Sequence, residues 1–221
     1  PMVRSVGSTS QVPAAPRAAD ALTEIPVKST VWPEVSTVPP LPPFGPPLAL
    51  MSPCAVVLPR GRDGWYMYSP VMPCERYAAY VDEGMALAEK HFPVSRAARG
   101  RAIGGWSMGG YGAMYTACRR SGDFAAAASI IGLVDFPRPA VGEPKQNYAV
   151  PPRFGVDSAV WEKYNPRRLI ARLRGTALFV AYADQAFERQ MNEAFLANAQ
   201  AAGFAVETLL LHGGHTFPMV E

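Results

Sequence analysis

The chain has 221 residues, about half of them hydrophobic (49%), and a formal net charge of +3 at pH 7. A domain of this length can bury about 70% of the surface of its unfolded chain, so the composition fits one globular domain with a real core. The small net charge and the lack of an interleaved basic and aromatic patch exclude a nucleic-acid binder, and no stretch has the length or purity of a membrane span.

The N-terminal quarter differs in composition from the rest of the chain. Twelve of the 23 prolines lie in residues 1–53, including the run VPPLPPFGPP at 38–47. Proline lacks an amide donor and fixes φ, so this run cannot form a helix or a central strand. We therefore expect a proline-rich irregular segment over residues 1–53 and a folded domain over residues 54–221.

The second part alternates short apolar runs with helical patterns. Apolar runs predict strands at 54–59, 101–106, 125–131, 176–182 and 205–211. Helical spacing predicts helices at 74–91, 108–120, 166–173 and 185–202, with Gly203 as a C-cap glycine. Residues 132–160 carry five prolines and read as a long connection.

This alternation predicts an α/β fold with a mostly parallel sheet and helices on both faces. In such folds ligands bind beyond the carboxyl ends of the strands, so the residues that follow each strand are the informative ones.

After the strand at 101–106 comes Gly105-Trp106-Ser107-Met108-Gly109. This sequence fits G-x-S-x-G between a strand and a helix, the context that a nucleophile elbow requires. We expect glycine at 105 and 109 to avoid clashes around a sharp turn. Ser107 is then the candidate nucleophile, and the Met108 amide at the helix N-terminus is the candidate oxyanion donor.

A serine nucleophile needs a base, and the chain has three histidines, one of which, His91, lies at a helix end. His212 and His215 both follow the last predicted strand, in HGGHTF. We prefer His215, because it lies in a glycine-rich loop that can turn back over the sheet.

The base needs an acid that fixes its tautomer. Asp184 follows the strand at 176–182, and Asp135, which follows the strand at 125–131, is the rival. The order Ser107, Asp184, His215 is that of the α/β-hydrolases, and the interval between Asp184 and His215 leaves room for one helix and one strand.

The chain resembles the "putative esterase" branch of the α/β-hydrolases, which includes S-formylglutathione hydrolase, feruloyl esterases and the antigen 85 acyltransferases. The similar pieces are GWYMYSP at 64–70, YVDEGMALAEKHFPVSRAARGRAIGGWSMGGYGA at 80–113, YADQAF at 182–187 and GGHTF at 213–217. The resemblance implies an α/β-hydrolase fold and hydrolysis of a carboxylic ester or thioester, with Ser107 as nucleophile, Asp184 as acid and His215 as base. It implies no metal and no cofactor.

The chain departs from the family pattern in its early part. Family members carry a His-Gly-type loop that donates a second oxyanion amide, and no such loop precedes residue 54, where Gly45 is a weak candidate. Family members also have a further helix after the histidine loop, whereas this chain stops at Glu221. We therefore expect a domain that is truncated at both ends. An acyltransferase, or a catalytically impaired binding protein of the same fold, is the alternative to a serine esterase.

Aromatic residues near the motif are candidates for the walls of the substrate pocket. Trp106, Trp65 and Tyr66 are the candidate walls, with core packing as the competing role, and the connection at 132–160 is the expected cap. We expect a small-molecule ester or thioester as the partner, with no nucleic acid and no membrane, and with a homodimer as the alternative to a monomer.

The three cysteines are Cys54, Cys74 and Cys118, an odd number with no metal-ligand spacing. We expect free thiols in a reducing compartment, with a Cys54–Cys74 disulfide as the alternative. The N-terminus lacks the apolar core of a secretory signal, which favours a cytoplasmic protein, and secretion stays open because the chain begins at Pro1.

Overall fold

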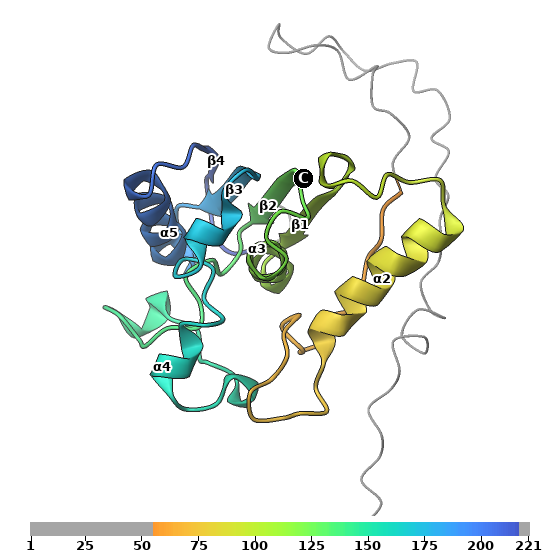
Figure 1. Cartoon of the computed structure of the whole chain (residues 1–221). Helices are drawn as coiled ribbons and strands as arrows, with labels where there is room; N and C mark the ends of the chain where they lie inside the picture. The colour runs from red at the N-terminus through yellow and green to blue at the C-terminus, as the bar shows by residue number, and fades with distance from the viewer. Residues whose placement is uncertain (1–54, 217–221) are drawn as a thin grey trace, which may run out of the picture.

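A four-stranded parallel sheet forms the centre of the computed structural model, which describes residues 55–216. The strands are β1 (Ala102–Trp106), β2 (Ala126–Ile130), β3 (Ala177–Ala183) and β4 (Val206–Leu211). They lie side by side in chain order (Figure 1). The register aligns Gly105 with Ser129 and Ser129 with Val180, so all four carboxyl ends meet at one edge of the sheet.

The α-helices are α2 (Tyr77–His91), α3 (Met108–Arg119), α4 (Ser158–Trp161) and α5 (Arg189–Ala201). The 3-10 turns are η2 (Ala98–Gly100), η3 (Pro144–Gln146), η4 (Pro152–Phe154) and η5 (Ile170–Leu173). Four of the predicted strands and three of the predicted helices are confirmed to within a few residues. Gly203 lies just after α5 with a φ of +79°, the left-handed conformation expected of a C-cap glycine.

Two predicted elements do not form. Residues 55–60 have no regular secondary structure, and Val56 and Leu58 are about three-quarters exposed. A strand needs a neighbour for its backbone hydrogen bonds, and no strand of the described region pairs with this segment. The helix predicted at 166–173 shortens to η5, because Pro166 and a turn of 3-10 bonds occupy its first half.

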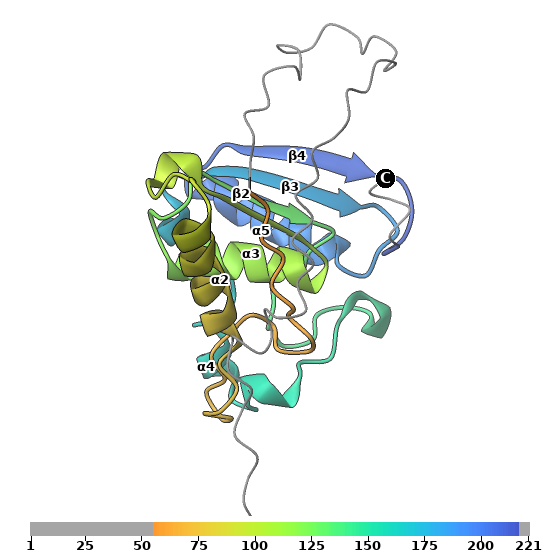
Figure 2. The ribbon, with the colours of Figure 1, turned by 90° about the vertical axis from the view of Figure 1, so that its right-hand side faces the viewer.

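The helices that contact the sheet lie below it in Figure 2, where no described helix covers the upper face. The strand residues agree with this view. Ile103, Ala127, Leu178, Val180 and Val206 belong to the core cluster on the helix side. Ala102, Gly104 and Trp106 point the other way along β1 and are exposed. Within residues 55–216 the expectation of helices on both faces is therefore met on one face only.

A second cluster lies beneath the carboxyl ends of the strands. It consists of buried aromatic and aliphatic side chains from α3, α5, the loop at 60–68 and the connection after β2, and we call it the aromatic cluster. Its buried members are Trp65, Met67, Tyr111, Tyr115, Leu133, Phe136, Phe154 and Met191. It joins α3 to the connection at 132–160, the predicted cap.

The described region also bears on membrane spans and on the cysteines. No described helix is long and apolar enough to cross a membrane. Cys74 is an exposed free thiol and Cys118 a buried one. The expected irregular segment at 1–53, with Cys54 and Gly45, lies outside the described residues.

Candidate active site

Ser107 stands on the turn between β1 and α3, where the sequence places it. Its φ of 54° and ψ of −118° lie in a backbone region that residues other than glycine rarely adopt. The turn is fixed on both sides, because Ser107 N donates to Ile130 O (2.9 Å) and Tyr111 N donates to Ser107 O (3.1 Å). Backbone strain held by its surroundings in this way is common at catalytic positions.

The two motif glycines are not equivalent. A Cβ at Gly105 would overlap the backbone of Gly109, whereas a Cβ at Gly109 would meet nothing within 4 Å. The close approach that the turn demands is thus made at Gly105. Gly110 is also crowded, since a Cβ there would lie 2.7 Å from Ser129 Oγ and 2.9 Å from Gly132 Cα. The expectation that Gly109 also avoids a clash is wrong.

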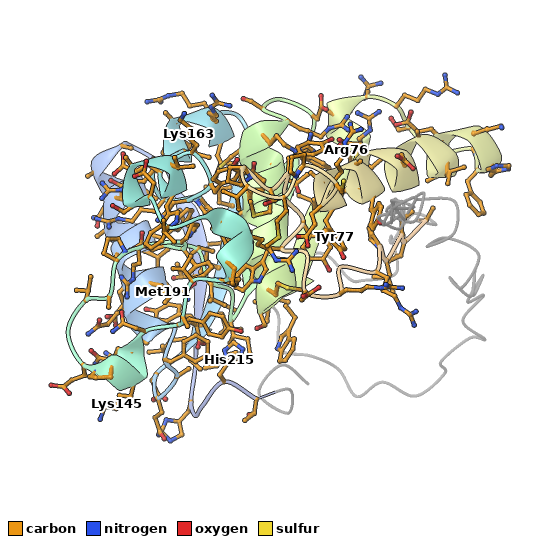
Figure 3. The ribbon with its side chains drawn as sticks, turned by 90° about the horizontal axis from the view of Figure 1, so that it is seen from below. Arg76, Tyr77, Lys145, Lys163, Met191 and His215 are labelled. Carbon is orange, nitrogen blue, oxygen red and sulfur yellow. The ribbon has the colours of Figure 1, made fainter. Side chains whose placement is uncertain are left out.

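His215 reaches Ser107 from the loop after β4. The Ser107 Oγ and His215 Nε2 atoms are 2.7 Å apart. The imidazole is mostly buried and lies against the rings of Phe187 (4.7 Å between centroids) and Trp106 (5.6 Å). In Figure 3 it lies on the side of the molecule away from Lys163. The structure therefore selects His215, and not His212, as the neighbour of Ser107.

The carboxylate beside His215 is Glu188. Its Oε2 lies 2.8 Å from His215 Nδ1, and its side chain is fully buried. A carboxylate only accepts hydrogen bonds, so this contact places the imidazole proton on Nδ1 and leaves Nε2 to accept from the Ser107 hydroxyl. The contact with Glu188 thus favours the tautomer of His215 in which Nε2 can act as a base toward Ser107.

Asp184, the acid predicted from the sequence, does not contact His215. Its Oδ2 lies 2.7 Å from His212 Nδ1, and its Oδ1 accepts from Gly213 N (2.8 Å). The Gly213 hydrogen bond first, and the His212 hydrogen bond second, hold the pKa of Asp184 below its ordinary value. The chain turns between β3 and α5, and this turn brings Glu188 rather than Asp184 beneath the histidine.

The rival acid Asp135 is also occupied elsewhere. It is buried, and its carboxylate accepts from Asn165 Nδ2 (2.9 Å) and Arg138 Nη1 (3.0 Å). Arg167 Nη1 lies 3.3 Å from the same carboxylate. These bonds tie the residues after β2 to the segment before η5, away from the serine.

The folded structure distinguishes Glu188 in a way that the sequence alone does not. Glu188 occupies the N-cap position of α5, where Ser, Thr, Asp or Asn is favoured, and its side chain makes no capping hydrogen bond. A glutamate in that place, after a strand whose end faces the nucleophile, is better explained by a partner outside the helix.

A half-open cavity of about 430 Å³ lies over Ser107. Its walls come from the loop at 62–65, the start of α3, the connection after β2, the turn between β3 and α5, and the histidine loop. The lining residues are Arg62, Asp63, Trp65, Ser107, Met108, Leu133, Tyr148, Phe187 and His215. Trp65 thus lies in the wall of this cavity, and Tyr148 shows that the 132–160 connection reaches it.

The other two predicted wall residues lie elsewhere. Trp106 is 38% exposed and contacts the outer side of His215 without lining the cavity. The Tyr66 ring packs against Gly61 and Gly112, and its burial raises the pKa of its hydroxyl. Tyr66 therefore has the competing packing role, and both Trp65 (φ 53°) and Tyr66 (φ 49°) have a left-handed backbone.

Met108 is the first residue of α3, so its amide has no partner within the helix and lies at the positive end of the helix dipole. No group of three or more metal-ligating side chains gathers within the described region. The arrangement brings a serine hydroxyl, an imidazole, a buried carboxylate and a helix N-terminus together, and groups of these kinds can carry out acyl transfer through a covalent intermediate.

Known structures share this fold. A ferulic acid esterase matches with a TM-score of 0.54 and 24% identity over 67% of this chain and 58% of that chain. FphF, a fluorophosphonate-binding serine hydrolase of Staphylococcus aureus, matches with a TM-score of 0.59 and 19% identity over 73% and 64% of the two chains. An S-formylglutathione hydrolase of Agrobacterium tumefaciens matches with a TM-score of 0.53 and 20% identity, over 72% of this chain and 64% of that chain.

This chain therefore spans less than two thirds of the length of these structures. At these identities the likeness shows the fold, a parallel α/β-hydrolase sheet, and not the substrate. A search of curated proteins finds no match. The family model described as "Putative esterase" matches residues 55–207, more than half of the chain. The chain belongs to this esterase family of α/β-hydrolases.

Proposed function

We propose that the protein is a serine hydrolase of carboxylic esters or thioesters. The observation that carries the proposal is the chain of two short contacts from Ser107 Oγ through the His215 ring to Glu188. Family membership supports the same reaction class.

The proposed mechanism has two halves. His215 Nε2 takes the Ser107 proton as Oγ attacks the substrate carbonyl, and the Met108 N–H donates to the oxygen that becomes negative. His215 then gives the proton to the departing alcohol or thiol, which leaves an acyl-serine. Water, deprotonated by the same nitrogen, attacks the acyl group, and His215 returns the proton to Ser107 Oγ as the acid is released.

Glu188 orients the imidazole and stabilises its positive charge while the proton is on Nε2. The cavity over Ser107 is lined by Trp65, Leu133, Tyr148 and Phe187, so it favours an acyl or alcohol group with an apolar surface. A cavity of about 430 Å³ suits a small-molecule ester.

The test is labelling of the full chain with a fluorophosphonate, with p-nitrophenyl acetate turnover measured in parallel. We expect one label, mapped to Ser107 by mass spectrometry, and loss of both label and turnover in Ser107→Ala. Failure to label a folded protein would contradict the proposal and favour a binding role. Product formed on an added alcohol instead of water would identify an acyltransferase.

A further inference from the structure

A second carboxylate–imidazole pair lies beside the first. Asp184 Oδ2 is 2.7 Å from His212 Nδ1, while Asp184 Oδ1 accepts from Gly213 N at 2.8 Å. The His212 ring is 85% exposed, and neither residue lines the cavity over Ser107. Both carboxylate oxygens of Asp184 thus form hydrogen bonds with the loop that carries His215.

The backbone reinforces these contacts. Asp184 N donates to Leu211 O (3.0 Å), and Gln185 N donates to Gly213 O (2.9 Å). Four hydrogen bonds therefore fasten residues 211–213 to residues 184–185. We call this arrangement the Asp184 bracket.

We propose that Asp184 is a positioning residue whose carboxylate, together with His212, holds the start of the histidine loop and so places His215 Nε2 against Ser107 Oγ. This inference rests on the proposed esterase function. Asp184 acts through the loop and does not touch the reacting atoms.

The reach of the loop explains why a bracket is needed. Gly214 alone separates the last bracketed residue from His215, and Gly213 has a φ of +132°, in the region that favours glycine. Two residues of chain can carry a side chain about 7 Å if their anchor is lost. A misplacement of about 1 Å at a reacting group can already cost about 100-fold in rate.

The chemistry of the bracket requires a carboxylate in particular. Both of its oxygens accept, one from the Gly213 amide and one from the His212 ring. Asparagine can still accept from the Gly213 amide, and it can meet His212 Nδ1 by donating to the other imidazole tautomer, so both contacts remain but lose the charge of the carboxylate. Asp184→Asn should therefore weaken both side-chain hydrogen bonds of the bracket without changing side-chain volume.

The experiment compares five variants of the full chain by steady-state kinetics and by the rate of fluorophosphonate labelling. For Asp184→Asn we expect kcat and the labelling rate to fall together by about 10- to 100-fold, with KM within about twofold of the wild type. The midpoint of its rate–pH profile should match the wild type, because the partners of His215 are unchanged. Glu188→Gln should displace that midpoint.

Two substitutions of His212 test the other half of the bracket. His212→Asn retains a donor where Nδ1 lies and should keep kcat within about twofold of the wild type. His212→Ala should lose about three- to tenfold, because one bond of the bracket is removed. The control is Gln185→Ala, which removes an exposed side chain and keeps the backbone bond, and it should behave as wild type.

Three results would overturn the inference. Asp184→Asn at wild-type kcat would show that the bracket does not position His215. Asp184→Asn with a loss as large as that of Glu188→Gln and the same displaced pH midpoint would make Asp184 the acid of the base itself. Equal activity of His212→Ala and His212→Asn would remove His212 from the bracket. Failure of the esterase proposal is separate, since the wild type itself would then neither label nor turn over.

Discussion

The side chain of Glu188 shows what a single residue contributes when its neighbours are fixed. It is fully buried, it makes no cap for the helix that it begins, and its Oε2 lies 2.8 Å from His215 Nδ1. Its function as an orienting acid is a prediction that a conservative change can test.

Glu188→Gln should lower kcat by about 10³- to 10⁴-fold, because an amide can hold the ring by donating to Nδ1 and so favours the wrong tautomer. KM should change little, since Glu188 does not line the cavity. Circular dichroism should show an intact fold. A kcat within tenfold of the wild type would show that another group orients His215.

Gly105 and Gly109 make a matched pair for the turn itself. Gly105→Ala should abolish folding or activity, because its Cβ would overlap the Gly109 backbone. Gly109→Ala meets open space within α3 and should leave the melting temperature unchanged or raise it, since alanine favours a helix over glycine by about 1 kcal/mol. Thermal unfolding of the two variants measures this, and equal destabilisation would contradict it.

Asp184 predicts a pH dependence of stability. Its folded-state pKa is lowered, chiefly by the Gly213 hydrogen bond and next by the His212 bond. The stability that this shift provides is present above the unfolded pKa of about 3.9 and is lost as the pH falls through the folded value. Urea unfolding should therefore separate wild type from Asp184→Asn at pH 7, with a gap that narrows below about pH 4. A gap independent of pH would exclude this linkage.

At the scale of elements, the connection after β2 is fastened over the site by Arg153. This buried guanidinium pairs with Glu75 and, at 2.9 Å, with Asp63, which lines the cavity. Ser69 Oγ also donates to Arg153 O (2.6 Å), and the neighbouring Phe154 is fully buried in the aromatic cluster. The connection is thus bound to the loop at 63–75 by charge as well as by packing.

Arg153→Met should destabilise the protein by about 2 kcal/mol and raise KM for a small ester, because Glu75 and Asp63 lose their partner and the cavity wall at Tyr148 loosens. The control is Arg168→Met. Arg168 is half exposed, and its ion pair with Glu162 is 3.6 Å long. Its replacement should therefore change the free energy of unfolding by no more than about 0.5 kcal/mol. Chemical unfolding and Michaelis kinetics decide between them, and equal losses would refute a specific fastening role.

At the scale of the whole molecule, α3 connects the two cores. Tyr111 and Tyr115 enter the aromatic cluster, while Met114 and Cys118 enter the cluster under the sheet. Asp82 on α2 pairs with Arg119 (2.6 Å) and Arg120 (2.8 Å) at the C-terminal end of α3. The turn that presents Ser107 is therefore anchored by both cores.

Cys118 should report on the unfolding of this whole assembly. It is fully buried, and burial raises the pKa of its thiol to about 12, so the reactive thiolate is scarce. We expect iodoacetamide to modify Cys74, which is exposed, in the native protein, and Cys118 only at the rate of global unfolding. Peptide mapping over a urea series measures both rates. Rapid modification of Cys118 in water would mean that α3 opens locally.

The sequence by itself determined the order of strands and helices, the turn at Ser107 and the histidine loop, because these depend on local patterns of apolar residues and glycine. It also placed Met108 at a helix N-terminus and Trp65 near the site. Such features follow from spacing along the chain, and the structure retains them within a few residues.

The tertiary structure decided which carboxylate meets His215 and which glycine is crowded. Asp184 and Glu188 lie four residues apart in one turn, and only the path of that turn relative to the β4 loop sends one to His212 and the other to His215. The same holds for Tyr66 and for Gly109, whose neighbours come from distant segments. Contacts between segments far apart in the chain leave no local pattern, so they can be assigned only once the chain is folded.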